Sequence, residues 1–190
     1  MGLNFSKQFL PIFLLIILIL VWTSVWSLFK IAIEAIPPLS FRVIIGIPAF
    51  ALLLFLGFKK VKTVYIPKSD FKPLLLISFF NVTLWQVLML YGINMLGGGR
   101  AAVLTYTMPV WATIFASIFG YERINISIII SLIFGMTGIF FLSLEINVFE
   151  NMLGFLITLS AGLSWAIGTM IVKYGGIKSD GLIVAGWQQI

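Results

Sequence analysis

The segment TYTMPVWATIFASIFGYER, residues 105–123, is the stretch that decides the fold of this chain. It is long and apolar enough to form a buried helix, yet it contains Pro109. A proline inside a helix removes a backbone hydrogen bond and clashes with the carbonyl four residues earlier, which costs about 3 kcal/mol. Membrane helices tolerate this cost where neighbouring helices, hydroxyl side chains or cavity water satisfy the freed carbonyl, here that of Thr105.

The composition indicates that lipid surrounds this helix. Of the 190 residues, 61% are hydrophobic and 9% are charged, and the mean hydropathy is +1.16. An ordinary soluble domain has about 25% charged residues. Six apolar runs have the length needed to cross a bilayer, roughly 20 residues each. They cover residues 9–29, 39–58, 74–96, 101–120, 126–144 and 152–172. The sequence therefore predicts an all-α integral membrane protein, a polytopic helical bundle.

The residue types that most enzymes and metal centres need are scarce in this chain. It has no cysteine and no histidine, and its six acidic residues fall near or beyond the ends of the expected spans. A membrane-embedded enzyme would need a nucleophile, a metal set or paired acids. The sequence therefore predicts no enzymatic activity, no metal and no cofactor.

The net charge of +6 is distributed unevenly along the chain. If six spans alternate in direction, nine of the twelve basic residues lie on one side of the membrane. These nine are Lys7, Lys59, Lys60, Lys62, Lys68, Lys72, Arg123, Lys173 and Lys178. Positive charge concentrates in cytoplasmic loops, so this asymmetry predicts a cytoplasmic N-terminus in a cell membrane. It also explains the charge without a nucleic-acid partner.

Two segments of the chain resemble each other. LVWTSVWSLFK ends at Lys30, and LSWAIGTMIVK ends at Lys173. The interval between Trp22 and Trp165 equals the interval between the two lysines. Five expected spans separate the copies, so the second copy must enter the bilayer from the opposite face, as in the inverted repeats of many secondary transporters. Chance similarity is the alternative, because tryptophan and lysine are common at the ends of membrane helices.

Taken together, these motifs resemble the EamA-type members of the drug/metabolite transporter superfamily. The resemblance rests on the first span with Lys30, on Pro37-Pro38-Leu39 with Arg42, on residues 101–123, and on Gly135 and Gly138. It implies ten helices in two inverted five-helix repeats, and the export or exchange of small metabolites, often amino acids. Residues 9–144 would form the first repeat, and residues 150–190 the incomplete start of the second.

The last residues of the chain depart from that pattern. The segment LIVAGWQQI, which ends at Ile190, would rise only about 13 Å as a helix, whereas a bilayer core is roughly 30 Å thick. We therefore expect the chain to be the first part of a longer protein. A natural half-transporter that pairs with a second copy, as a homodimer, is the alternative.

A polar face of the first span suggests a substrate cavity. Trp22, Thr23, Trp26 and Lys30 fall on one side of a helix, where they would supply aromatic walls, a hydroxyl and one cation. The alternative for Lys30 is an interfacial lysine whose charged end reaches the membrane surface. The sixth span repeats this design with Trp165 and Thr169.

Further cavity candidates lie on the second, third and fourth spans. Asn81 and Gln86 would bind substrate through hydrogen bonds, or would hold helices together. Around Pro109, the residues Thr105 and Tyr106 would line a kinked, locally polar helix segment. Arg42, about one turn inside the second span, could pair with a substrate carboxylate or reach the interface.

These features predict a secondary transporter, or permease, that works by alternating access around a cavity near the bilayer midplane. The expected partners are the lipid bilayer and a small-molecule substrate. A membrane assembly or structural subunit that transports nothing is the alternative.

Overall fold

A computed structural model of the chain describes residues 5–144 and 151–189. Its helices are α1 (Phe5–Ala35), α2 (Pro38–Val61), α3 (Lys68–Ile77), the π-helix η1 (Ser78–Leu84), α4 (Trp85–Leu96), α5 (Gly98–Thr105), α6 (Met108–Ile118), α7 (Ile126–Ser143), α8 (Met152–Tyr174) and α9 (Gly181–Trp187). Residues 150 and 190, the expected bounds of the second repeat, lie outside the described residues.

Among the described residues, five helical segments are long and apolar enough to cross a membrane. They are α1, α2, the continuous α3–η1–α4, the pair α5–α6, and α8; α7 is a shorter apolar helix. The predicted all-α polytopic membrane protein is confirmed. The third expected span contains a π-helix, and the fourth is divided into two helices. A simple apolar run predicts neither of these two features.

The ends of the helices follow from local sequence signals. The side chains of Asn125, Asn151 and Asp180 each accept a hydrogen bond from a backbone N–H in the first turn of α7, α8 and α9, which is how short polar residues start helices. The connection between α4 and α5 is the single residue Gly97, whose φ of 86° favours glycine.

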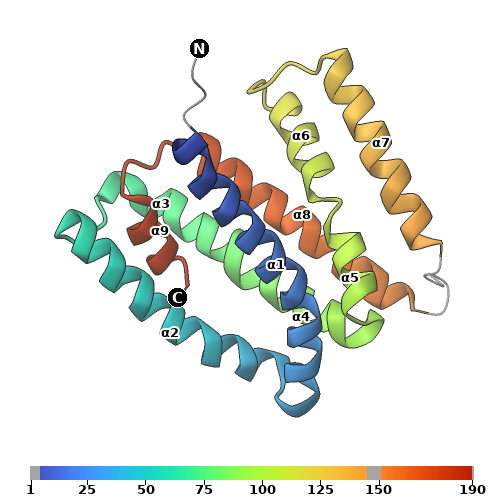
Figure 1. Cartoon of the computed structure of the whole chain (residues 1–190), viewed down its shortest axis with the longest axis horizontal. Coiled ribbons are helices and arrows are strands. Elements are labelled where there is room, and N and C mark those ends of the chain that lie inside the picture. The colour runs from blue at the N-terminus through green and yellow to red at the C-terminus, as the bar shows by residue number, and fades with distance from the viewer. Residues whose placement is uncertain (1–4, 145–150, 190) are drawn as a thin grey trace.

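Helix α8 lies at the centre of the bundle. It packs against α3, η1, α4, α5 and α6, whereas α7 lies at one edge (Figure 1). The buried side of α8 consists of small residues, among them Gly154, Ala161, Gly162 and Gly168. Small residues let helix backbones approach closely in membranes, where the hydrophobic effect does not drive helices together.

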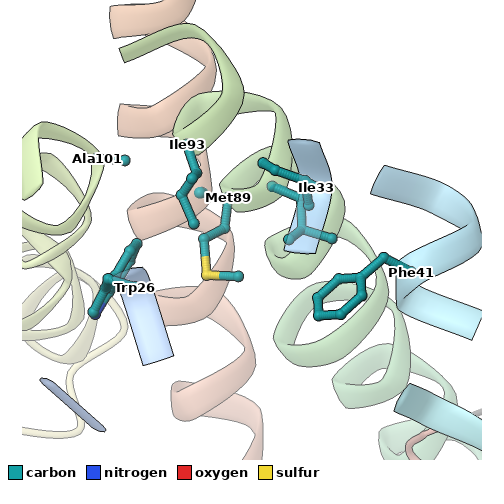
Figure 2. Packing of buried hydrophobic residues seen from close by; sticks show 8 residues of the cluster. Trp26, Ile33, Phe41, Met89, Ile93 and Ala101 are labelled. Carbon is teal, nitrogen blue, oxygen red and sulfur yellow. The ribbon is translucent and has the colours of Figure 1, made fainter. Parts of the chain in front are cut away.

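An apolar cluster joins α1, α2, α4, α5 and α8. Figure 2 shows Trp26, Ile33 and Phe41 packed around Met89 and Ile93 of α4. The side chains of Met89 and Ile93 are at most 1% exposed. This cluster fixes the position of α1 against α4, and thereby the position of the tryptophans on α1.

Asp70 anchors the connection between α8 and α9. Its carboxylate accepts hydrogen bonds from the backbone N–H of Lys178 at 3.0 Å and from the N–H and hydroxyl of Ser179 at 2.8 Å and 2.7 Å. Lys60 pairs with Asp180 across the same connection at 2.7 Å. The α2–α3 and α8–α9 connections, which contain Lys62 and Lys178, therefore lie at the same end of the bundle.

Candidate functional site

Three tryptophans from three helices form an aromatic stack, in which Trp165 stacks on Trp22 and its ring lies tilted against that of Trp85. The ring centroid of Trp165 on α8 lies 5.6 Å from that of Trp22 on α1 and 5.2 Å from that of Trp85 on α4, with interplanar angles of 28° and 32°. Trp165 thus has a ring partner on each of two other helices. Aromatic stacking of this kind adds about 0.5–1.5 kcal/mol per pair beyond the buried area.

Three buried polar atoms of the third span, one of them on Trp85 of this stack, have no hydrogen-bond partner in the described part of the chain. They are the side-chain oxygens of Asn81 and Gln86 and the indole nitrogen of Trp85. An unpaired buried polar group costs about 1–3 kcal/mol, and native proteins contain few of them. Their concentration within six residues makes this stretch a candidate for contact with a ligand or with a further helix.

The π-helix η1 explains how these residues come together. Its hydrogen bonds run from residue i to i+5, so it turns through a smaller angle per residue than an α-helix. Gln86 therefore lies nearer to the side of Asn81 than α-helical spacing indicates. The hydroxyl of Ser164 on α8 donates to the Phe80 carbonyl of η1 at 2.6 Å, and π-helices of this kind are frequent at functional sites.

The fourth span accommodates Pro109 because its helix is interrupted just before this residue. Helix α5 ends at Thr105, and α6 begins at Met108, so Pro109 occupies the first turn of a new helix, where its missing N–H is harmless. The hydroxyls of Thr105 and Thr107 donate to the carbonyls of Ala101 and Leu104 at 2.9 Å and 2.8 Å. The span is therefore divided, rather than only kinked as predicted.

A cleft of about 410 Å³ lies between α6 and α8. Pro109 lines it from the break, and Trp165 and Thr169 line it from α8. The cleft also has Glu122 and Lys173 among its lining residues. Three predicted site residues thus meet in one cleft, and Trp165 connects this cleft to the aromatic stack.

Glu122 holds the α6–α7 connection against the end of α8. Its carboxylate accepts hydrogen bonds from the Lys173 ammonium and, at 2.7 Å, from the Tyr174 hydroxyl, and the ring of Tyr121 stacks on that of Tyr174 with centroids 4.1 Å apart. The bonds from Lys173 and Tyr174 stabilise the carboxylate and hold the pKa of Glu122 below its ordinary value of 4.5.

We expect Glu122→Gln to lower the melting midpoint at pH 7, by an amount on the order of a few degrees, because it removes the ion pair with Lys173. A carboxyl whose pKa is depressed on folding stabilises the protein above its ordinary pKa, and this stabilisation disappears as the pH falls through the folded value. The difference from wild type should therefore shrink below about pH 4.5. Glu34→Gln is the matched control, since Glu34 makes a 3.6 Å ion pair with Lys30 on its own helix. Equal effects of the two variants at every pH would contradict a linking role for Glu122.

The other predicted polar residues of α1 and α2 have partners outside the stack. Thr23 is exposed and donates to the carbonyl of Ile19. Lys30 pairs with Glu34. The guanidinium of Arg42 donates to the backbone carbonyl of Gln189 at 2.9 Å and lines a separate cleft beside α2.

Three aromatic and hydroxyl candidates make packing contacts with other helices. Trp26 belongs to the apolar cluster, and its ring meets the edge of Tyr106 with centroids 5.9 Å apart. Thr105 is fully buried, and its backbone lies directly against Gly162. These contacts fix the break between α5 and α6 against α1 and α8.

The structure adds three residues to the site that the sequence does not select. Trp85 shares a side of the third span with Asn81, but nothing in the sequence singles out its indole nitrogen. Glu122 and Lys173 are 51 positions apart, and each alone is typical of a charged helix end. Within the described residues, no group of three or more acidic, histidine or cysteine side chains could hold a metal ion.

Comparison with known proteins places this arrangement in a family. The model of the EamA-like transporter family matches residues 9–144. The uncharacterized transporter YoaV of Bacillus subtilis is 31% identical over 160 residues, which are 81% of this chain and 54% of that protein. YvbV, another uncharacterized transporter of B. subtilis, is 27% identical over 177 residues, 92% of this chain and 57% of the relative.

A third relative is the uncharacterized inner membrane transporter YedA of Escherichia coli K12, which is 28% identical over 171 residues, 86% of this chain and 54% of the relative. The chain spans about half the length of these relatives. No solved structure gives a significant match. With its helical membrane fold and the family match over residues 9–144, the chain belongs to the EamA-like transporter family.

Proposed function

We propose that the chain is part of a non-enzymatic permease that exports or exchanges small metabolites, amino acids or related compounds, by alternating access across the cell membrane. The observation that carries this proposal is the set of unpaired buried polar atoms on Asn81, Trp85 and Gln86. Polar groups at membrane depth are costly unless they serve a substrate or a partner helix, and one of these three residues, Trp85, belongs to an aromatic stack from three helices.

An inverted-repeat organisation, with residues 9–144 as the first repeat and residues 150–190 as the start of the second, accompanies this proposal. Helices α2 and α9 begin at Pro38 and Gly181, which are separated by the same interval as Trp22 and Trp165. The two equivalent tryptophans also stack face to face. Equivalent residues of inverted repeats meet where the pseudo-two-fold axis passes, which in such transporters is close to the substrate site.

The proposed orientation has the N-terminus in the cytoplasm. The ion pair between Lys60 and Asp180, together with the bonds from Lys178 and Ser179 to Asp70, brings the α2–α3 and α8–α9 connections and the lysines in and beside them to one end of the bundle. Lys30 lies at the end of α1 that leads into α2, away from these connections. This distribution supports the orientation because basic residues favour the cytoplasmic side.

The proposal is tested by measuring metabolites inside and outside cells that lack or overproduce the full-length protein. We expect overproduction to lower the internal level and raise the external level of at least one small metabolite several-fold, and deletion to do the reverse. A double variant, Asn81→Leu with Gln86→Leu, should abolish the redistribution at the same membrane abundance, because it removes both amide groups. A stable stoichiometric complex with no metabolite redistribution would instead identify an assembly subunit.

A further inference from the structure

A second cleft, of about 630 Å³, lies where the end of α2, the α2–α3 connection, α3 and α9 meet. Helix α9 packs against α2 on this side of the bundle (Figure 1). Six of the residues that line the cleft are Phe58, Lys62, Val64, Tyr65, Phe71 and Trp187. Among the described residues of its lining, Lys62 is the one charged side chain, and the rest of the wall is mainly apolar and aromatic.

Contacts between the α2–α3 connection and α9 fix the wall of this cleft. The indole nitrogen of Trp187 donates to the backbone carbonyl of Val64 at 2.8 Å, and the rings of Trp187 and Phe50 meet with centroids 5.6 Å apart. Lys62 caps α2, because its backbone N–H donates to the carbonyl of Phe58 at 2.9 Å. The side chain of Lys62 therefore leaves the main chain at a defined point of the cleft.

The surroundings of the cleft carry an excess of positive charge. Five lysines lie on the last turn of α2, in the connection and on the first turns of α3, namely Lys59, Lys60, Lys62, Lys68 and Lys72. The acidic residues nearby are already engaged, since Asp180 pairs with Lys60 and Asp70 accepts the backbone N–H bonds of the α8–α9 connection. Within the described ranges, Lys62, Lys68 and Lys72 make no ion pair. An anionic ligand would therefore meet cations that have no competing carboxylate.

Exposed aromatic side chains indicate the level of the membrane at which this cleft lies. The side chains of Tyr65 and Phe71 are 68% and 56% exposed, and both line the cleft. Aromatic and basic residues gather at the ends of membrane helices, at the level of the lipid headgroups. A ligand with an anionic head and apolar chains matches both Lys62 and the apolar wall, whereas a soluble anion would use the lysines alone.

We propose that this cleft binds an anionic phospholipid, with the headgroup phosphate on Lys62 and part of an acyl chain against Phe71 and Trp187. Polybasic segments beside membrane helices attract anionic lipids, and each lysine near the surface strengthens that binding by about fivefold. The cleft adds to this general attraction a defined place for one lipid molecule. The site is separate from the cleft between α6 and α8, and it does not depend on which compound the protein transports.

Trp187 makes the proposed binding measurable, because it lines the cleft. The full-length protein in detergent is titrated with phosphatidylglycerol whose acyl chains carry bromine, which quenches tryptophan fluorescence on contact. Phosphatidylcholine with the same brominated chains is the zwitterionic comparison. We expect half-maximal quenching at an approximately fivefold lower concentration of phosphatidylglycerol, and we expect Trp187→Phe to remove this difference. Equal quenching by the two lipids, or a difference that Trp187→Phe leaves intact, would overturn the assignment.

Charge-neutralising variants separate the cleft from the basic surface around it. Lys62→Gln should remove the preference for phosphatidylglycerol, and Lys62→Arg should keep it. Lys72→Gln is the matched control, because it makes the same change of charge but Lys72 lines a different cleft, between α3, α6 and α8. Its preference should remain that of wild type. Equal losses in Lys62→Gln and Lys72→Gln would show that general surface charge attracts the lipid, and the cleft would not be a site.

A soluble competitor tests whether the acyl chains are needed. Glycerol phosphate at the same concentration has a charged headgroup without chains, so it should not displace the brominated phosphatidylglycerol. Displacement would assign the lysines to small anions and overturn the lipid site. If Lys62→Gln lowers the melting midpoint, the comparison of the two lipids on wild type and Trp187→Phe decides the assignment. Because the readout is lipid binding, a failure of metabolite redistribution would leave this inference standing, and a failure of lipid preference would leave transport standing.

Discussion

Replacing Gly168 with alanine is expected to lower the stability of the protein by about 1–3 kcal/mol and to reduce transport on the order of tenfold to a hundredfold. A Cβ atom at this position would lie 2.5 Å from the Cβ of Asn81 and 2.9 Å from its Cα and backbone nitrogen. Backbone atoms cannot move aside as a flexible side chain can, so α8 and η1 must separate. That movement displaces Asn81, one of the residues proposed to bind the substrate.

The control for this prediction is a glycine that differs only in its surroundings. A Cβ at Gly138 on α7 would meet no atom within 4 Å, so Gly138→Ala should stabilise its helix by about 0.5–1 kcal/mol and leave transport unchanged. Melting midpoints and metabolite redistribution measure both effects. If Gly168→Ala and Gly138→Ala behaved alike, the close contact of α8 with η1 would not be a determinant of the site.

Much of the architecture can be predicted from the sequence because membrane helices leave a strong signal. Apolar runs and composition identify the helices and their approximate bounds, and the paired tryptophan segments predict that Trp22 and Trp165 are equivalent positions. Asn81 and Gln86 can be selected as candidates because amides are rare at membrane depth. These predictions depend on residue type and spacing within single segments.

What the sequence could not predict depends on geometry between segments. The π-helix at Ser78–Leu84 changes the angle between successive side chains. No local residue pattern predicts this π-helix. The pairing of Glu122 with Lys173 joins parts of the chain that only the packing of α6 against α8 brings together. The division of the fourth span at Tyr106 and Thr107 likewise depends on Gly162, whose missing side chain makes room for the backbone of Thr105.

Trp165→Ala should be the most damaging aromatic substitution in the protein, with a loss of about 3 kcal/mol and no detectable transport. The variant removes the ring that contacts both Trp22 and Trp85, so α1, α4 and α8 lose the aromatic contact that adds to their shared apolar cluster. It also removes one wall of the cleft between α6 and α8. The melting midpoint and the metabolite redistribution assay report these two losses separately.

Trp22→Ala is the graded comparison, because it removes one of the two rings that stack on Trp165 and keeps the pair with Trp85. Its melting midpoint should fall between those of wild type and Trp165→Ala. Trp165→Phe should recover part of the stability, since a smaller ring still stacks, but less of the transport, since the smaller ring leaves part of the cleft wall open. If Trp22→Ala and Trp165→Ala lowered the melting midpoint equally, the contact between Trp165 and Trp85 would contribute nothing to stability. The central role of the three-helix stack would then be wrong.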